Sequence, residues 1–275
     1  DHLRVLSFIG AGSAARVYAA EHRRLGVRRA VKIPWADSLA DHRVELRFQR
    51  EGRATADLDS PHLVKMLELG QLQPKLPYMV MELVEGQSLA RLLRHSGPLD
   101  PLCVSLLGSQ VARALETAHD AGVVHRDLKP ANIVIVRTAD RDLAKLVDFG
   151  IAKLLGARPE DQLTATGAIT GTPSYISPEQ ISGSEFSRAS DYYSLGVMLY
   201  EALAGRVPFT ASRPGELFAM HLHAAPPALP IQGTLAELVL SLLDKEPERR
   251  LEICRNLGDR LEVLAGEQRR FVTQA

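Results

Sequence analysis

The apolar pattern of the chain changes near Glu85-Gly86, from short strand-like runs to longer helix-like stretches. Before this point, apolar runs such as 17–20 and 29–33 are typical of strands, and one helical stretch interrupts them. The chain has 275 residues, which is long for one hydrophobic core, so two packed lobes are expected. We therefore predict an α+β fold, with a small sheet-rich lobe over residues 1–85 and a larger, mostly helical lobe over residues 86–275.

Local signals predict the ends of some helices and strands. Asp100-Pro101 opens an apolar run that closes at Ala121-Gly122, where glycine suits a left-handed cap. Thr234, with Glu237 three residues later, has the pattern of a capping box. Apolar residues on both sides of residues 125–132 predict a loop between two short strands.

Composition limits the classes of partner. The chain has 33 basic and 33 acidic residues, which gives no electrostatic reason to expect nucleic acid or an anionic membrane. No apolar run approaches the roughly 18–20 residues that span a bilayer. Cys103 and Cys254 lack a metal or redox spacing, so buried, reduced thiols in a cytosolic protein are expected. Because the chain starts at Asp1 and not at a methionine, we expect it to be a piece of a longer protein. The lack of a membrane segment then applies to this piece alone, and a membrane anchor elsewhere in the longer protein remains an alternative.

A glycine-rich turn lies near the N-terminus, at residues 9–17. Glycines let backbone N–H groups approach phosphate oxygens without a side chain in the way. A dinucleotide-binding turn has a similar pattern, but it requires a helix immediately afterwards, and residues 17–20 are strand-like. A plain glycine hairpin is the other alternative, and it is disfavoured by Lys32 at the end of the next strand.

A lysine in an apolar strand needs an acidic partner if it is buried. Lys32 stands in such a strand, and Glu51 is the predicted partner. Glu51 shares one face of a predicted helix with four other residues, so it should point inward, where a lone carboxylate is costly. Those four residues are Val44, Phe48, Thr55 and Leu58.

Three further motifs complete the set. They are His125-Arg126-Asp127-Leu128-Lys129-Pro130-Ala131-Asn132, Asp148-Phe149-Gly150 and Ser177-Pro178-Glu179. With the glycine turn and Lys32, they offer a cation for phosphates, a carboxylate base and two oxygen ligands for Mg²⁺. Over nearly all of its length the chain resembles the catalytic domain of protein Ser/Thr kinases, and it is most similar to the bacterial eukaryotic-like group.

The resemblance implies a two-lobed kinase fold, with an antiparallel sheet and one main helix in the small lobe. It implies that Asp127 is the base and that Lys129 faces the transferred phosphoryl group. Lys32, held by Glu51, would bind the α- and β-phosphates of ATP, while Asn132 and Asp148 would bind Mg²⁺, with Mn²⁺ as an alternative. The implied nucleotide-binding residues are Ile9, Gly10, Ala11, Gly12, Ser13, Ala14, Ala15, Arg16, Val17, Ala30, Lys32, Met81, Glu82 and Val84.

The resemblance also implies how the site is controlled and supported. Thr164 and Thr166 match autophosphorylated threonines, for which Arg126 would be the cationic partner, and Thr172 matches the threonine that docks the substrate. Structural roles follow for Asp191, which would tether residues 125–132, and for Glu179, which would pair with Arg250. The chain departs from the family pattern at Ala15, where a third glycine is usual, at Ser177, where Ala is usual, and at Leu251, where Pro is frequent.

These features favour a Mg²⁺-dependent protein Ser/Thr kinase that acts on protein substrates and on itself, with a homodimer as a candidate assembly. A nucleotide-binding scaffold with little catalysis is the alternative, and its only support is Ala15. A small-molecule phosphotransferase is disfavoured, because such an enzyme has no use for a threonine-rich segment that ends in Ser-Pro-Glu.

Overall fold

The computed structural model describes residues 2–12, 15–35, 52, 55–72, 76–139, 142–148, 173–184 and 186–274. The first part, here called the small lobe, is an antiparallel five-stranded sheet in the order β1-β2-β3-β5-β4. Its strands are β1 (Leu3–Ala11), β2 (Ala15–His22), β3 (Arg28–Pro34), β4 (Met66–Leu72) and β5 (Leu76–Glu82). β1 and β4 form the opposite edges of the sheet, yet His2 beside β1 is hydrogen-bonded to Glu68 of β4 at 3.0 Å. The two edges therefore curve toward each other.

The helix predicted between β3 and β4 is described only at Gly52, Thr55 and Ala56, which are helical. Gly52 lies so close to the sheet that a Cβ atom there would be 3.1 Å from a methyl group of Leu69 and 3.4 Å from that of Met79. The glycine therefore allows the helix to pack closely on β4 and β5. This close packing explains why a glycine, which otherwise weakens a helix interior, occupies the position.

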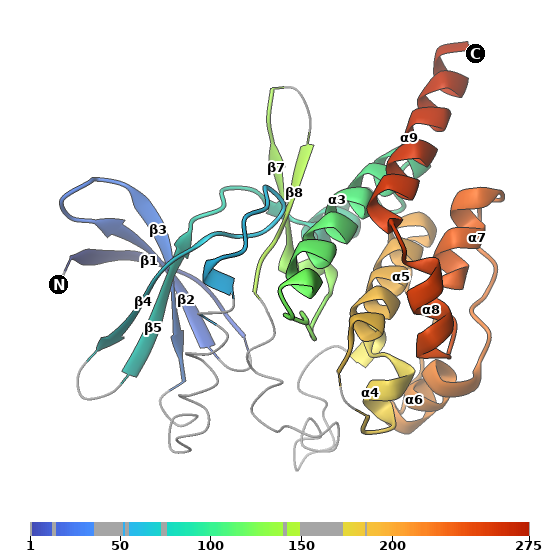
Figure 1. Cartoon of the computed structure of the whole chain (residues 1–275), viewed down its shortest axis with the longest axis horizontal. Coiled ribbons are helices and arrows are strands. Elements are labelled where there is room, and N and C mark those ends of the chain that lie inside the picture. Colours follow the sequence, from blue (N-terminus) through green and yellow to red (C-terminus); the bar gives the residue numbers. More distant parts are fainter. Residues whose placement is uncertain are drawn as a thin grey trace.

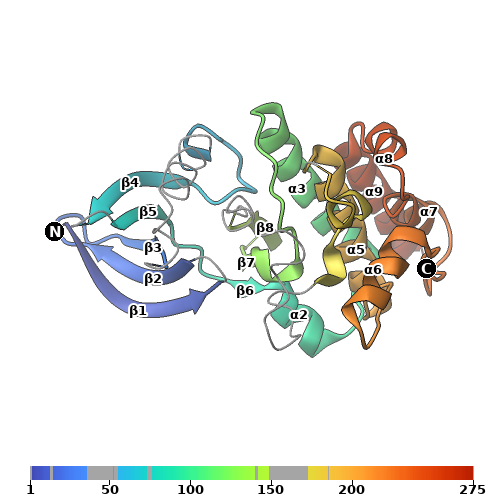
Figure 2. The same cartoon turned by 90° about the horizontal axis from the view of Figure 1, so that it is seen from below.

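The second part, here called the large lobe, is mostly helical (Figure 1). Its small sheet β6-β7-β8 lies between the helices and the small lobe. Figure 2 shows α3, α5, α8 and α9 grouped on the side away from the small lobe. The strands are β6 (Gln87–Ser88), β7 (Ile133–Arg137) and β8 (Asp142–Leu146). The helices are α2 (Leu89–Ser96), α3 (Pro101–Asp120), α4 (Pro178–Ile181), α5 (Arg188–Ala204), α6 (Pro214–His223), α7 (Thr234–Ser241), α8 (Pro247–Ile253) and α9 (Leu257–Gln274), with 3₁₀ turns η2 (Pro130–Asn132) and η5 (Pro173–Tyr175).

The core of the large lobe forms around α5, which is buried along most of its length. Gly196 of this helix permits close packing, because a Cβ atom there would lie 2.7 Å from the Cβ of Leu242. The predicted ends of α3 are confirmed: Asp100 caps its first turn by accepting a 2.8 Å hydrogen bond from Leu102, and Gly122 follows with a φ of 77°.

Three local predictions are wrong. Cys103 is exposed, because it lies on an outer face of α3, so the expectation that both cysteines are buried holds only for Cys254. Thr234 is the first residue of α7 and not its cap; the capping position is Gly233, whose φ is 94°, and no side chain caps this end. The residues before the loop at 125–132 form no strand, because the chain enters this loop directly from the end of α3. β7 follows the loop as predicted, and it pairs with β6 and β8.

The two lobes are joined near the site by backbone hydrogen bonds. The N–H of Leu146, at the end of β8, donates to the carbonyl of His62 at 2.8 Å, and the N–H of Val64 donates to Leu146 at 3.0 Å. These bonds fix the residues after β8 against the small lobe. The boundary predicted near Glu85-Gly86 falls between the end of β5 and the start of β6, and the division at that residue stays a prediction.

Candidate active site

The loop at residues 125–132, here called the catalytic loop, is anchored by one buried carboxylate. Asp191 stands in the first turn of α5 and is 1% exposed. Its two oxygens accept hydrogen bonds from the backbone N–H of His125 at 2.7 Å and of Arg126 at 2.8 Å. The ring of His119 on α3 adds a third contact at 2.8 Å. The anchor holds Arg126 at a φ of 70°, in the left-handed region that non-glycine residues seldom adopt.

Two polar side chains of the catalytic loop donate hydrogen bonds to Asp127. Lys129 Nζ donates to Asp127 Oδ2 at 2.6 Å, and Asn132 Nδ2 donates to the carbonyl of Asp127 at 2.8 Å. The second bond fixes the orientation of the Asn132 amide. The turn η2 begins at Pro130, whose ring sets the backbone angle there, and brings Asn132 back toward Asp127. Asp127 and Lys129 are each more than a quarter exposed, so both remain accessible.

The end of β8 brings a second carboxylate to the catalytic loop. The N–H of Val147 donates to the carbonyl of Asn132 at 2.8 Å, which places Asp148 beside the loop. Asp148 has a φ of 66°, a second left-handed residue at the site. It forms an ion pair with Lys32 of β3, whose side chain is 6% exposed, whereas that of Asp148 is 43% exposed. The site thus joins residues of both lobes.

His125 is fully buried below this group. Burial lowers its pKa, so the neutral ring is favoured, and Nδ1 accepts a hydrogen bond from the N–H of Asp127 at 3.3 Å. These contacts indicate that His125 supports the loop and does not transfer protons.

The glycine-rich turn has open space beside two of its glycines. A Cβ atom built on Gly10 would meet nothing within 4 Å, and one on Gly12 would meet only the carbonyl of Ala15, at 4.0 Å. The turn is closed by a 2.8 Å hydrogen bond from the N–H of Gly12 to that carbonyl. Ala15 itself is 5% exposed, so its methyl group is buried in the sheet and does not fill this open space.

The predicted nucleotide-binding residues of β3 and β5 are neighbours. Ala30 lies opposite Met81 in the ladder between these strands. Glu82 follows, and its N–H donates to the carbonyl of Lys65 at 2.9 Å, while its carboxylate pairs with Lys145 of β8 at 2.9 Å. Its side chain therefore links the lobes. Val84 lies in the connection between β5 and β6.

Several predicted site residues lie outside the residues that the structure describes. These are Ser13 and Ala14 of the glycine turn, Glu51, and the threonines Thr164, Thr166 and Thr172. The pairing of Lys32 with Glu51 therefore stays a prediction, and the contact that the structure shows for Lys32 is with Asp148.

The side chain of Arg126 has an unusual environment. Its Nε atom is buried without a hydrogen-bond partner among the described residues. Its guanidinium carbon lies 5.6 Å from the ring of Phe186, a residue to which the sequence analysis gave no role. A buried donor without a partner is costly, which makes this arginine a candidate to bind an anion.

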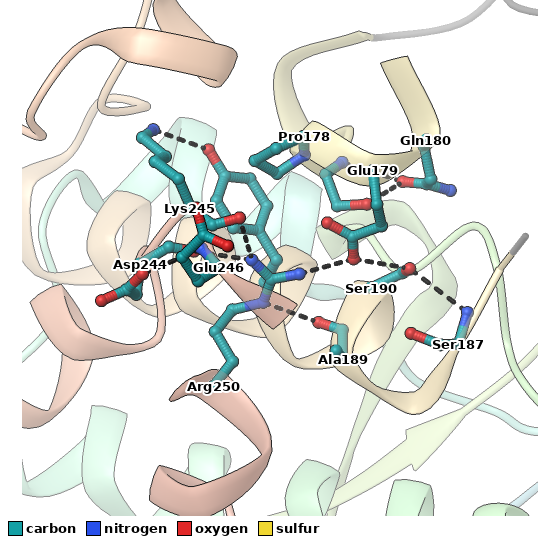
Figure 3. A network of polar contacts seen from close by, with 12 residues as sticks. Pro178, Glu179, Gln180, Ser187, Ala189, Ser190, Asp244, Lys245, Glu246 and Arg250 are labelled. Atoms are coloured by element: carbon teal, nitrogen blue, oxygen red, sulfur yellow. Dashed lines mark hydrogen bonds and ion pairs between the residues drawn. The ribbon is translucent and has the colours of Figure 1, made fainter. Parts of the chain in front are cut away.

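The large lobe contains a buried ion pair, as the resemblance implied. Arg250 is 0% exposed, and its Nη2 donates to Glu179 Oε1 at 2.5 Å (Figure 3). The same guanidinium donates to the carbonyls of Ala189 at 3.1 Å and Asp244 at 2.6 Å, and Ser190 donates to Glu179 at 2.8 Å. The network ties α4 to α5 and α8.

Besides Phe186, sequence reasoning missed two residues that contact this machinery. One is His119, whose ring reaches Asp191; its position in a long apolar helix gave no signal. The other is Trp35, whose indole contacts the glycine turn. A signal existed for Trp35, since it is the single tryptophan of the chain and follows the strand of Lys32 directly.

Comparison with known proteins agrees with this geometry. The family model described as protein kinase domain matches residues 3–260. Similar curated proteins include serine/threonine-protein kinase pkn2 of Myxococcus xanthus, 37% identical over 94% of this chain and 32% of that protein. PknA of Mycobacterium tuberculosis is 39% identical over 90% of this chain and 57% of that protein, and PknB is 36% identical over 97% and 44%.

The fold also matches a solved structure. The crystal structure of Rad53 1–466 in complex with AMP-PNP superposes with a TM-score of 0.76 and 26% sequence identity, over 94% of this chain and 65% of that one. The predicted two-lobed kinase fold is thus confirmed. The chain spans about a third to somewhat over half of the length of the curated relatives named above. With a family model that covers most of its length, the chain belongs to the protein kinase domain family.

Proposed function

We propose that this chain transfers the γ-phosphoryl group of ATP to serine and threonine hydroxyls of proteins. One observation carries the proposal: Lys32 pairs with Asp148, and the backbone bond from Val147 to Asn132 holds Asp148 beside the group formed by Asp127, Lys129 and Asn132. The curated relatives are named serine/threonine-protein kinases, which supports the same activity.

The residues of the catalytic loop suit proton and charge handling at the acceptor. Asp127 would accept the proton of the substrate hydroxyl as the hydroxyl oxygen attacks the γ-phosphorus. The bond from the γ-phosphorus to the leaving ADP breaks in line with that attack. Lys129, already 2.6 Å from Asp127, would offset negative charge on the transferred group. Most of the rate enhancement then comes from positioning, because the reaction needs no covalent enzyme intermediate.

The described residues fit a magnesium site of the kind that nucleotides complete. Asp148 offers a carboxylate and Asn132 an amide oxygen, both hard oxygen ligands. The described part of the chain contains no group of three or more His, Cys, Asp or Glu residues that could hold a metal ion. Mg²⁺ is commonly bound by one or two protein oxygens together with substrate phosphates, and when bound it would neutralise phosphate charge.

The glycine turn and Lys32 fit the phosphates of a nucleotide. The open space above Gly10 and Gly12 admits phosphate oxygens close to the backbone, and the buried ammonium of Lys32 supplies a cation. If Glu82 contacts the adenine ring of the nucleotide, it would use its backbone carbonyl. Its N–H and its carboxylate already bind Lys65 and Lys145. The similar Rad53 structure was solved with AMP-PNP, an ATP analogue.

We extend the proposal to autophosphorylation at Thr164 or Thr166, with Arg126 as the residue that binds the phosphate. Protein substrates and the chain itself would then both be acceptors, and a homodimer stays a prediction. No helix in the described part of the chain is long and apolar enough to cross a membrane. Since ATP is the proposed donor, we expect the domain to face the cytoplasm, with or without an anchor in a longer protein.

A single incubation tests the activity. The chain is mixed with γ-labelled ATP and Mg²⁺, alone and with a generic basic protein, and the labelled residues are identified by phosphoamino-acid analysis. Label on serine and threonine is expected, and it should disappear with Asp127→Asn. Label that persists in that variant, or no label with the unmodified chain, would contradict the proposal.

The metal assignment has a separate readout. Nucleotide should raise the thermal stability of the chain much more with Mg²⁺ than without. A ligand that binds only the folded state stabilises it, and Mg²⁺ would link the phosphates to Asn132 and Asp148. Asp148→Asn should remove the difference. An equal shift with and without Mg²⁺ in the unmodified chain would argue against Asn132 and Asp148 as ligands.

A further inference from the structure

Trp35 lies on the face of the sheet opposite to Lys32. Side chains alternate along β3, so Lys32 and Pro34 share one face and Ile33 lies on the other. Trp35, the first residue after the strand, lies on the side of Ile33, because its ring contacts Arg16, which is opposite Ile33 in the ladder. At this end of the strand, Lys32 and Pro34 are buried, whereas Ile33 and Trp35 are only partly buried. Trp35 is therefore not placed to touch a nucleotide that binds against Lys32. Any influence on such a ligand has to pass through the glycine turn.

Two contacts connect Trp35 to that turn. Its indole Nε1 donates a hydrogen bond to the carbonyl of Gly12 at 3.1 Å. The guanidinium carbon of Arg16 lies over the indole ring, 4.4 Å from its centre, at a distance typical of cation–π contacts. The register explains the second contact: Arg16 lies opposite Ile33 in the ladder, so Trp35 is its diagonal neighbour on the same face.

Both polar groups of the Gly12 backbone thus have partners. The N–H of Gly12 donates to Ala15 within the turn, and its carbonyl accepts from Trp35 outside it. Side-chain packing does not fix Gly12, because a Cβ atom at this position would meet only the carbonyl of Ala15, at 4.0 Å, so these two hydrogen bonds are the contacts that orient its backbone. Ala15, on one side of the turn, is paired with Pro34 of β3, and the indole adds a link from the end of β3 to Gly12 on the other side.

We propose that Trp35 is a positioning residue that holds the glycine turn over the phosphate-binding side of Lys32, and so lowers the KM for ATP. The inference rests on the proposed function, because it assumes that the turn receives nucleotide phosphates. If only the held turn binds tightly, then the apparent affinity falls in proportion to the fraction of molecules in which the turn is held. Loss of one hydrogen bond, worth ~1 kcal/mol, corresponds to a loss of affinity of about fivefold.

The test is Trp35→Phe, which removes the N–H donor and keeps a ring under Arg16. The matched control is Tyr78→Phe, which also removes one hydrogen bond from an aromatic side chain of the same sheet, the 2.9 Å bond to Glu68, far from the turn. Binding of AMP-PNP with Mg²⁺ is measured by calorimetry, and kcat and KM for ATP by phosphate transfer. Thermal unfolding of each variant verifies that it is folded.

Trp35→Phe should raise both the Kd for AMP-PNP and the KM for ATP about fivefold and change kcat by less than about twofold. Tyr78→Phe should change neither constant. Arg16→Gln, which leaves the N–H in place, should give a smaller rise, of roughly two- to threefold. Equal constants for Trp35→Phe and Tyr78→Phe, or a loss confined to kcat, would overturn the inference.

The same experiments separate this inference from the proposed function. If the unmodified chain binds AMP-PNP but transfers no phosphate, the proposed function fails, and the Kd values still decide the role of Trp35. Since Trp35 is the single tryptophan, its fluorescence reports on the turn directly. Emission should change when AMP-PNP binds to the Asp127→Asn variant, which holds nucleotide without turnover, and unchanged emission at saturating AMP-PNP would contradict a link between the turn and the ligand.

Discussion

Lys32 of β3 and Asp148 after β8 form an ion pair, although 116 positions separate them in the sequence. The pair joins the two lobes at the point where we propose that phosphate and metal bind. The same lysine is predicted to pair with Glu51 in the active arrangement, so it has two candidate carboxylates.

Double-mutant cycles should distinguish the two partners of Lys32. Without nucleotide, Lys32→Met and Asp148→Asn should show a coupling in unfolding free energy of about 1 kcal/mol, because their side chains are in contact. In phosphate transfer, Lys32→Met and Glu51→Gln should cost less together than the product of their single losses. Asp142, an exposed residue at the start of β8, serves as the control partner and should show no coupling. Fully multiplicative losses with Glu51 would exclude it as the carboxylate that positions Lys32.

Asp127→Asn should lower kcat by roughly 10²- to 10⁴-fold, the range for loss of a general base, while nucleotide affinity stays nearly unchanged. The reason is that the carboxylate acts on the acceptor hydroxyl and not on ATP. Phosphate transfer and calorimetric binding are measured side by side, with Asp142→Asn as a variant that removes a carboxylate elsewhere. Turnover close to that of the unmodified chain would remove Asp127 from its role.

Arg250→Ala should destabilise the chain by about 3–5 kcal/mol, because it leaves the buried carboxylate of Glu179 without its cation. The neighbouring Arg249→Ala is a matched control, since the Arg249 side chain is 70% exposed and lies 3.7 Å from Asp244. It should change stability by less than about 1 kcal/mol. Denaturant unfolding measures both variants, and similar values for the two would show that the buried pair is not a major source of stability.

Stability should fall as the pH drops below about 6.5, and His221 should account for part of the loss. Burial, with the nearby charge of Lys245, lowers the pKa of His221 from 6.5 to about 3. Because the folded-state pKa lies below the unfolded value, this contribution is complete above pH 6.5 and is lost progressively toward pH 3. Lys245, whose pKa burial lowers to about 8, adds no slope in this acidic window.

The control for this pH effect lies on the same helix. His221→Gln should flatten the dependence of unfolding free energy on pH between 5 and 6.5 by up to about 1.4 kcal/mol per pH unit. His223→Gln, at an exposed position two residues later, should leave the slope unchanged. An identical slope in His221→Gln and the unmodified chain would mean that His221 does not resist protonation in the folded state.

Autophosphorylation should occur at Thr164 or Thr166 and raise activity, because a phosphate would give Arg126 the anion that its buried Nε lacks among the described residues. Intact-mass and peptide mapping compare the unmodified chain with Asp127→Asn, which should carry no phosphate. Thr164→Ala with Thr166→Ala should lose most of the activation, and Thr172→Ala should be nearly inactive through loss of substrate docking. Full activity in the double variant would contradict this control but not the catalytic assignment.

The sequence by itself determined much of the architecture and the local chemistry. Residues close together in the chain, such as Asp127, Lys129 and Asn132, are constrained by short spacing and by Pro130, so their convergence could be predicted. The change from strand-like to helical periodicity predicted both lobes, because periodicity reports which face of an element is buried. The resemblance added the pairing of Glu179 with Arg250, which no local pattern contains.

Tertiary structure decided the contacts that depend on register and packing. The bond from Trp35 to Gly12 depends on which face of β3 the indole occupies and on how the turn is closed. The sequence gives no reason for Gly52 within a helix; the reason is the close packing of this residue on β4 and β5. The start of α7 is set by the left-handed backbone of Gly233 and not by Thr234. In each case several local conformations are close in energy, and contacts with distant segments select among them.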